Sequence, residues 1–145
     1  PSHKKFIISI KTDELNKSLR KKIIIGRIQD HEINYIDSRW ENNKIIGKSN
    51  KFGSFSLFID TIPPIITGPI INNQTIECEI YDDLSGIKEY RGELNGQWIL
   101  MEYDFKTGKL IHEFKEKPNN KMHDFSLSII DNVDNTNQIN VKFIR

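Results

Sequence analysis

The sequence predicts an all-β protein made of two small β-domains. Alanine, the best helix former, is absent from the 145 residues, whereas isoleucine, which favours strands, is frequent. Short runs in which apolar and polar residues alternate recur along the chain, as they do in half-buried strands. Pro63 and Pro64 lack backbone donors and interrupt these runs. We therefore predict domains at residues 1–60 and 61–145, joined by a short proline hinge.

Five strands are expected before the hinge. The segment Thr12 to Lys22 is short and heavily charged, so we predict a loop with at most one helical turn there. Asn42-Asn43 suits a tight turn. The predicted strands are Lys5 to Ile10, Lys22 to Gln29, Asn34 to Glu41, Lys44 to Lys48 and Phe52 to Ile59. Five strands are few for a closed sandwich, so we expect strands from outside this segment to complete the first half.

The second half shows the spacing of a β-sandwich. Asn95-Gly96 is the strongest hairpin signal, because a type I′ turn needs positive φ at both central residues. Trp98 alternates with Leu100, which favours burial of Trp98 in the core. The predicted strands are Thr75 to Tyr81, Ile87 to Leu94, Gln97 to Tyr103, Leu110 to Phe114, Asp124 to Ile130 and Gln138 to Ile144. Short strands at such even spacing predict a sandwich.

Composition excludes several classes of function. The 21 basic and 20 acidic residues nearly cancel, so no nucleic-acid partner is expected. Cys78 is the single cysteine, which excludes an internal disulfide and multi-cysteine zinc patterns, and its place in the alternation predicts a buried, inert thiol. No apolar run has the length of a membrane span, and no signal peptide precedes Pro1. The missing signal does not indicate a cytosolic origin, because the abrupt start Pro-Ser-His-Lys-Lys is also compatible with a piece cut from a longer secreted protein.

A set of motifs carries a family resemblance. They are Asp60-Thr61-Ile62-Pro63-Pro64-Ile65, Asp82-Asp83-Leu84-Ser85-Gly86-Ile87, Tyr90-Arg91-Gly92, Leu94-Asn95-Gly96-Gln97-Trp98, Tyr103-Asp104, Lys106, Ile130-Asp131-Asn132, Asn135-Thr136 and Phe143-Ile144-Arg145. In this order and spacing they resemble the C-terminal immunoglobulin-like region of M23-family peptidases from Bacteroidetes. The similarity is dense in the second half and loose in the first. Asp134 stands where such domains often have a glycine, so the resemblance does not predict the backbone conformation of that turn.

The resemblance implies two immunoglobulin-like β-sandwich domains in tandem, forming a non-catalytic accessory region of a peptidoglycan-cutting metallopeptidase. Its implied location is the periplasm or the cell surface. The implied partners are a neighbouring peptidase domain of the same parent chain and peptidoglycan, with zinc held only in the separate catalytic domain. The histidines are His3, His31, His112 and His123. No two of them have the His-x-His spacing, and Glu116 stands where a zincin helix beginning at His112 needs its second histidine, so no catalytic residue is expected here.

Two other classes of function stay open. Asp82 and Asp83 at one turn, and Asp131 and Asp134 at another, offer the oxygen ligands that Ca²⁺ prefers, which would make the chain a calcium-stiffened adhesion or spacer domain. The alternative is a purely structural role, in which these side chains cap tight turns. A glycan-binding or peptidoglycan-binding module would instead use an aromatic surface, with Trp40, Tyr90, Trp98 and Tyr103 as the candidate contacts, although aromatic side chains also pack sandwich cores.

Overall fold

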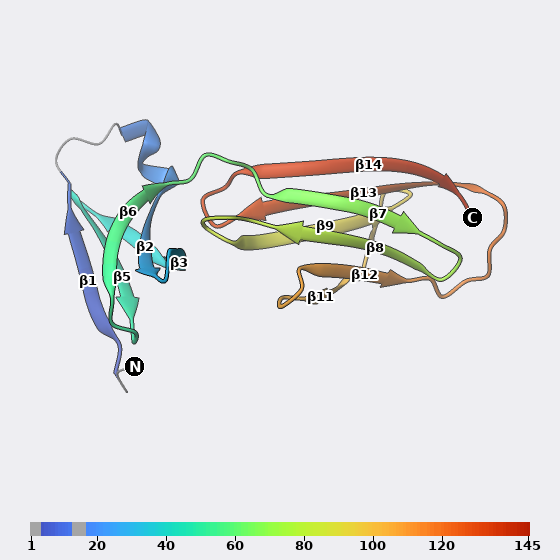
Figure 1. The fold of residues 1–145 in the computed structure, drawn as a ribbon. Helices are drawn as coiled ribbons and strands as arrows, with labels where there is room; N and C mark the ends of the chain where they lie inside the picture. Colours follow the sequence, from blue (N-terminus) through green and yellow to red (C-terminus); the bar gives the residue numbers. More distant parts are fainter. Residues whose placement is uncertain (1–3, 13–16) are drawn as a thin grey trace. The chain divides into compact units, whose positions relative to one another are not determined.

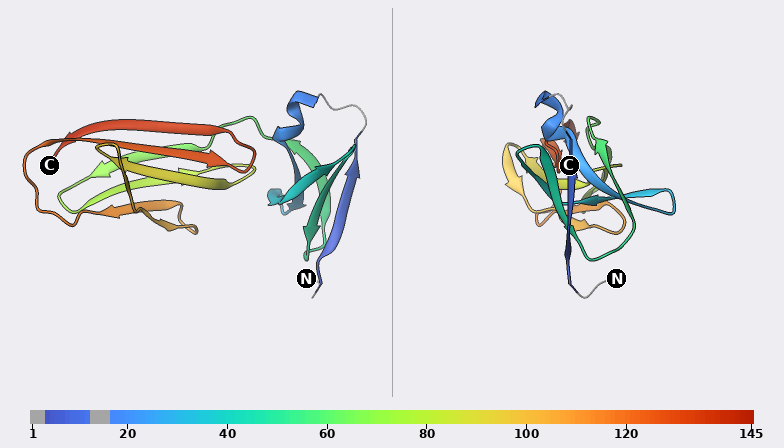
Figure 2. Two further views of the ribbon diagram at one scale, coloured as in Figure 1. Left: turned by 180° about the vertical axis from the view of Figure 1, so that it is seen from behind. Right: turned by 90° about the vertical axis from the view of Figure 1, so that its left-hand side faces the viewer.

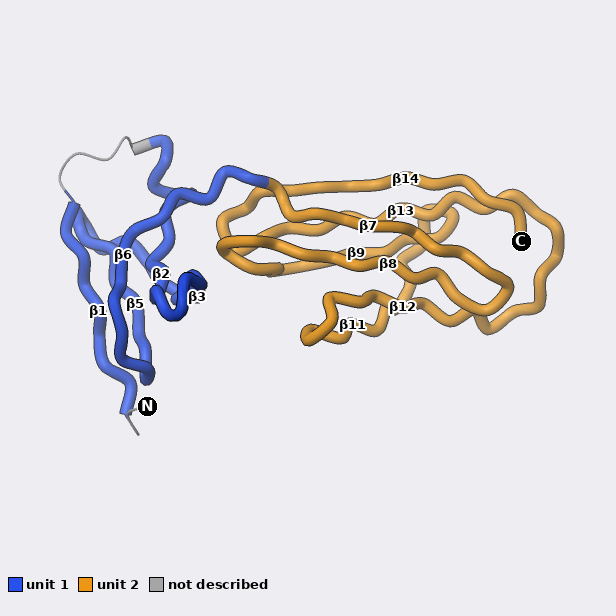
Figure 3. The backbone as a smooth tube through the Cα atoms, viewed as in Figure 1, with its two compact units in different colours: residues 1–62 blue, residues 63–145 orange. Residues whose placement is uncertain are grey.

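The computed structural model describes residues 4–12 and 17–145. Almost all of its regular structure is antiparallel β-sheet (Figure 1), which confirms the predicted all-β class. The chain forms two compact units, Pro1–Ile62 and Pro63–Arg145 (Figure 3), which we call unit 1 and unit 2. The division between the units falls two residues after the predicted boundary.

Unit 1 contains two three-stranded sheets, ordered β1-β5-β4 and β3-β2-β6. Its elements are β1 (Phe6–Lys11), the 3-10 helix η1 (Lys17–Lys22), β2 (Ile23–Gln29), β3 (Glu32–Ile36), β4 (Ser38–Glu41), β5 (Lys44–Ser49) and β6 (Ser54–Ile59). η1 lies in the segment where at most one helical turn was expected, and residues 13–16 of that segment lie outside the described residues.

The prediction of one strand from Asn34 to Glu41 is wrong. The chain leaves one sheet of unit 1 after β3 and enters the other at β4, with Asp37 between them. Tyr35 pairs with Gly26 on β2, whereas Ser38 pairs with Gly47 on β5. One continuous run of alternating apolar residues is therefore divided between two different sheets.

The core of unit 1 lies between its two sheets. Its buried side chains are Ile8, Ile23, Ile25 and Ile45, with half-buried Phe6, Ile10, Leu19, Ile36, Trp40, Phe55 and Leu57 packed against them. Leu19 of η1 belongs to this set, so the helix is held by packing as well as by its own hydrogen bonds. At the end of β6 the buried Asp60 accepts a hydrogen bond from the Ile62 amide at 3.2 Å, which caps the turn into the prolines.

Unit 2 contains two four-stranded sheets, ordered β11-β12-β8-β7 and β10-β9-β13-β14. Its strands are β7 (Ile65–Ile71), β8 (Thr75–Tyr81), β9 (Ile87–Leu94), β10 (Gln97–Ile99), β11 (Glu102–Asp104), β12 (Lys109–Glu113), β13 (Met122–Asp131) and β14 (Thr136–Ile144). β7 was not predicted, because Gly68 and Pro69 interrupt its pattern. An edge strand with a register shift between Thr67 and Ile70 accommodates them.

The predicted strand from Gln97 to Tyr103 is also wrong as a single element. β10 and β11 are three residues each and belong to opposite sheets. The chain crosses between the sheets at Leu100 and Met101, and Met101 is 2% exposed.

The core of unit 2 is shared by its two sheets, which face each other (Figure 2). One sheet contributes Ile76, Cys78, Ile80 and Leu110, the other contributes Phe125, Leu127 and Ile129, and Met101 lies in the connection between them. The unit is therefore sandwich-like.

Candidate functional site

The turn after β8 is organised by Asp82. Its Oδ1 accepts hydrogen bonds from the Gly86 amide at 2.6 Å, the Leu84 amide at 3.2 Å and the Ser85 hydroxyl at 3.4 Å. One carboxylate oxygen thus satisfies several donors of its own turn, the geometry that aspartate commonly supplies at tight turns. Gly86 has φ +80°, so the sharp return into β9 needs a residue without a side chain.

The turn between β13 and β14 is organised by Asp131, which is fully buried. Its Oδ1 accepts from the amides of Val133 at 2.9 Å and Asn135 at 2.8 Å, and its Oδ2 accepts from the Asn135 side chain at 2.6 Å. Buried charge is costly unless hydrogen-bonded, and these three donors offset that cost. Asp134 adopts φ +62° in this turn, so aspartate takes the left-handed conformation expected of a glycine.

The two turns meet at one end of unit 2. The Asn132 side chain donates to the carbonyls of Ser85 at 2.8 Å and Gly86 at 3.1 Å, which ties the turns together directly. Carboxylate oxygens of Asp82 and Asp131 lie within 4.8 Å of each other, a spacing that a hard cation can bridge. Backbone amides already donate to the Oδ1 atom of both carboxylates.

The other two predicted calcium ligands point to different partners. Asp83 accepts from the Tyr81 hydroxyl at 2.9 Å, and Asp134 pairs with the ammonium of Lys88 at 2.6 Å. The structure thus brings together Asp82 and Asp131 and gives Asp83 and Asp134 other roles. Calcium binding stays a prediction, and the geometry accounts for all four side chains as turn caps or surface partners.

Three of the four predicted glycan contacts are packed inside their units. The indole of Trp40 donates to the Arg20 carbonyl at 2.9 Å and lies under the Arg20 guanidinium, 4.9 Å from the ring centre. Tyr90 donates to the Met101 carbonyl at 3.2 Å and packs on Tyr103 at 5.5 Å between ring centres. These rings present little aromatic face to a ligand, because they pack against the cores of units 1 and 2.

Trp98 is the exception, and its predicted burial is wrong. Its side chain is 58% exposed, while the neighbouring Ile99 packs against the core. The reason lies at Gly92, opposite Ile99. A Cβ on Gly92 would stand 2.6 Å from the Met101 sulfur, so this glycine leaves the space that Met101 fills and thereby turns Trp98 outward.

A cavity opens beside the turn of Asp82, and Tyr103, one of the predicted glycan contacts, is among the residues that line it. It has a volume of about 480 Å³ and lies between β8 and the β11–β12 hairpin. Tyr81 and Phe105, which are 57% and 78% exposed, line it together with Glu79 and Thr107. Two exposed aromatic rings next to hydroxyl and carboxylate groups are suited to contact with a sugar. Phe105 was missed because it lies in a turn, outside any alternating run.

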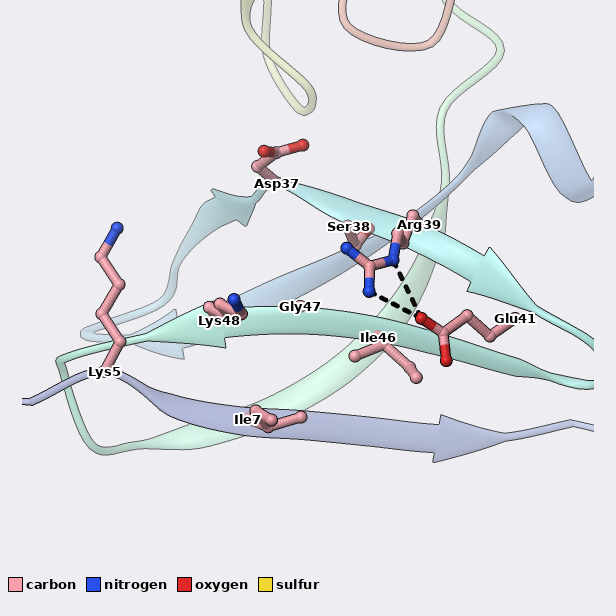
Figure 4. Close-up of a pocket in the computed structure, with 9 residues that line it drawn as sticks. All are labelled: Lys5, Ile7, Asp37, Ser38, Arg39, Glu41, Ile46, Gly47 and Lys48. Atoms are coloured by element: carbon pink, nitrogen blue, oxygen red, sulfur yellow. Dashed lines mark hydrogen bonds and ion pairs between the residues drawn. The ribbon is translucent and has the colours of Figure 1, made fainter.

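Unit 1 carries a second cavity on the outer face of the sheet β1-β5-β4 (Figure 4). It has a volume of about 510 Å³. Its lining residues are Lys5, Ile7, Asp37, Ser38, Arg39, Glu41, Ile46, Gly47 and Lys48. The Arg39 guanidinium bends back to Glu41, donating from Nε at 3.0 Å and Nη2 at 2.7 Å. The ammonium groups of Lys5 and Lys48 are the remaining positive charges of this lining.

The histidines stay apart in the described part of the chain. His112 contacts the Leu100 carbonyl at 2.8 Å, and His123 stacks on Phe143 with ring centres 5.4 Å apart. His31 lies in the turn after β2 with φ 69°. Among the described residues, the group of potential metal ligands that the geometry assembles contains aspartates and no histidine.

Burial makes Cys78 unreactive. The side chain is 3% exposed, and burial raises the pKa of its thiol to about 11. Since the thiolate is the nucleophile and metal ligand, Cys78 is a core residue, as its place in the alternation suggested.

No protein-family model matches this chain, and no curated protein sequence matches it significantly. In the part of the chain that the structure describes, no helix is both long and apolar enough to cross a membrane. The resemblance to accessory regions of M23-type peptidases therefore stays a prediction.

Proposed function

We propose that this chain is a non-catalytic interaction region of two immunoglobulin-like domains in tandem, joined at Pro63 and Pro64, that belongs to a secreted peptidoglycan-cutting metallopeptidase. Its role is to position or pack against the catalytic domain of the same parent chain. Zinc belongs to that catalytic domain, and the region acts in the periplasm or at the cell surface.

The observation that carries the proposal is the strand order of unit 2. If β7 to β14 are lettered A, B, C, C′, D, E, F and G in chain order, one sheet has the order D-E-B-A and the other C′-C-F-G. This order matches the two sheets of an immunoglobulin-type sandwich and so supports the proposed fold. The resemblance to M23-type accessory regions rests mainly on motifs in this same unit. Strand order and motifs therefore support the same family.

An accessory role also fits the chemistry of the described residues. Asp82 and Asp131 are engaged by backbone amides, and His112 and His123 lie at unrelated positions. An interaction region instead needs exposed apolar groups on a rigid scaffold. Trp98 and Leu100, 58% and 62% exposed on adjacent outward positions, supply such groups.

The first test is the identity of the native polypeptide. We would isolate it from its source cells with an antibody against this chain and sequence it by mass spectrometry through the region before Pro1. We expect an upstream metallopeptidase core in which a His-x-His motif and a separate motif with histidine and aspartate together supply the three protein ligands of an open zinc site. A native polypeptide without such a core would overturn the proposal.

A second candidate is a glycan-binding module, which the cavity beside Tyr81 and Phe105 favours. Its test is co-sedimentation of the chain with insoluble cell walls. Retention of the chain by the walls would support binding, and a chain that stays wholly in the supernatant would exclude it.

A further inference from the structure

The near-neutral charge of the chain conceals a separation between its two units. Residues 1–62 carry 12 lysine and arginine residues against 7 aspartate and glutamate residues, whereas residues 63–145 carry 9 against 13. Unit 1 therefore has a net charge of +5 and unit 2 a net charge of −4. In both units the excess charge is concentrated on the outer face of one sheet.

The acidic face is the outer side of the sheet β11-β12-β8-β7. The inner side is fixed by the buried Cys78 and Leu110, which pair directly with each other. Pairs one residue away therefore point outward. Five acidic side chains and one lysine occupy these outward positions: Glu77, Glu79, Glu102, Asp104, Glu113 and Lys109.

Apolar side chains lie among these charges. Ile65, Ile70 and Tyr81 are 54%, 69% and 57% exposed and pair across β7 and β8 on the same outward side. Asp104 stays ionised at neutral pH, because hydrogen bonds from the Lys106 amide at 3.0 Å and the Thr107 hydroxyl at 2.9 Å lower the pKa of its carboxyl. The face is thus acidic and partly apolar.

The basic face is the outer side of the sheet β1-β5-β4 in unit 1, where the cavity of Figure 4 lies. Ile8 and Ile45 point inward, so the alternate positions point outward. The outward basic side chains are Lys5, Lys11, Arg39, Lys44 and Lys48. Glu41 is paired with Arg39, and Asp37 lies at the margin. The exposed apolar group here is Ile7, which is 66% exposed.

We propose that the basic face of unit 1 binds the acidic face of unit 2 in a second copy of this chain. The two faces are opposite in charge, and each offers isoleucine side chains that lose contact with water on docking. Two like faces repel, so the contact joins different surfaces of the two copies. Such a heterologous contact extends head to tail beyond a dimer unless the rotation closes a ring.

The size of the faces predicts a weak complex. Three strands of about six residues cover roughly 20 by 15 Å, or about 300 Å² in projection, which is below the usual area of a stable interface. Charge attraction therefore supplies much of the affinity, and salt weakens it, because the Debye length falls from about 10 Å at 0.1 M to about 3 Å at 1 M. This inference does not depend on the role proposed above.

Sedimentation of the 145-residue chain tests the proposal. At low salt we expect the weight-average mass to rise about 1.5-fold or more as the concentration increases from about 20 to about 500 µM, and to return to the monomer value at about 0.5 M salt. A weight-average mass that stays at the monomer value at low salt across this range would overturn the proposal. This holds even if the reason is that the two faces bind each other within one chain.

Two charge-reversed variants locate the contact. In the first variant Lys5→Glu and Lys48→Glu remove the net positive charge of the basic face, and in the second Glu102→Lys and Glu113→Lys cancel the net negative charge of the acidic face. Glu102 and Glu113 pair with the uncharged Ile111 and Thr75, so their reversal adds no like-charge pair across the strands. We expect each variant to be monomeric alone. An equal mixture of the two should associate again, since the unaltered basic face of the second variant can bind the unaltered acidic face of the first.

A matched control separates face charge from net charge. Glu89→Lys with Asp124→Lys gives the chain the same net charge as the second variant but changes exposed residues of the other sheet of unit 2. This control should associate like the unaltered chain. Association that survives the substitutions on either face, or that the control abolishes equally, would overturn the proposal.

Discussion

Cys78 shows how one buried side chain makes stability depend on pH. Burial raises the pKa of its thiol from 9.0 to about 11. Between these values the unfolded chain loses the thiol proton while the folded chain keeps it. The folded state then binds more protons, so the free energy of unfolding falls as the pH rises from about 9 to about 11.

We predict that replacing Cys78 by alanine makes this pH dependence shallower. Urea denaturation of both proteins at several pH values between 8 and 11 would measure it. Because tyrosines and lysines titrate in the same range in both proteins, the difference between the two slopes isolates the thiol. Equal slopes would contradict the prediction.

Trp98 marks the limit of alternation as a guide to burial. The run Trp98-Ile99-Leu100-Met101 is apolar throughout, so its pattern fits either face of a strand. Which face is buried depends on the partner strand, where Gly92 leaves room for Met101. A shift of one residue moves every side chain to the other face.

At the scale of elements, turns decide where the strands of unit 2 end. Gly96 and Gly108 both have positive φ, +77° and +75°, in hairpin turns. Their surroundings differ. A Cβ on Gly96 would meet nothing within 4 Å, whereas a Cβ on Gly108 would stand 2.6 Å from the Ile80 carbonyl oxygen. The Gly108 carbonyl also accepts a hydrogen bond from the Ile80 amide at 2.8 Å.

We predict that Gly108→Ala destabilises unit 2 more than Gly96→Ala. Left-handed backbone costs alanine about 1 kcal/mol at either site, and displacement of the β12 hairpin from β8 adds about 1 to 3 kcal/mol at Gly108 alone. Urea midpoints of the two variants would measure the difference. Equal midpoints would show that the hairpin shifts at no cost.

The splitting of predicted strands belongs to the same scale. The Asn95-Gly96 turn lies between β9 and β10 as its residues indicate. In contrast, Asp37 and the Leu100-Met101 connection carry no glycine or proline. The chain changes sheets there because its next partner strand lies in the other layer, which local sequence does not encode.

At the scale of the molecule, each unit holds a probe that reports on it alone. Trp40 packs in the core of unit 1 and Cys78 in the core of unit 2. In a Trp98→Phe background, tryptophan fluorescence follows unit 1, while thiol labelling follows unit 2. The fully buried Ile25 and Leu127 offer matched core substitutions, one in each unit.

We predict that Ile25→Ala shifts only the fluorescence transition and Leu127→Ala shifts only the onset of thiol labelling. Each substitution removes about 2 to 5 kcal/mol from its own unit, and units with separate cores unfold separately. Urea titrations with both probes would measure this. A shift of both probes by either variant would show that the chain unfolds as one cooperative body.

Local sequence was sufficient for the all-β class, the break at Pro63 and Pro64, and the burial of Cys78, because composition, missing backbone donors and alternation act within a few residues. The tertiary structure alone decided which strands share a sheet, that Asp82 and Asp131 meet, and that Trp98 faces water. It also showed that charges scattered along the sequence gather on one sheet face of each unit. These features depend on pairing between distant strands, and a local pattern is compatible with several such pairings.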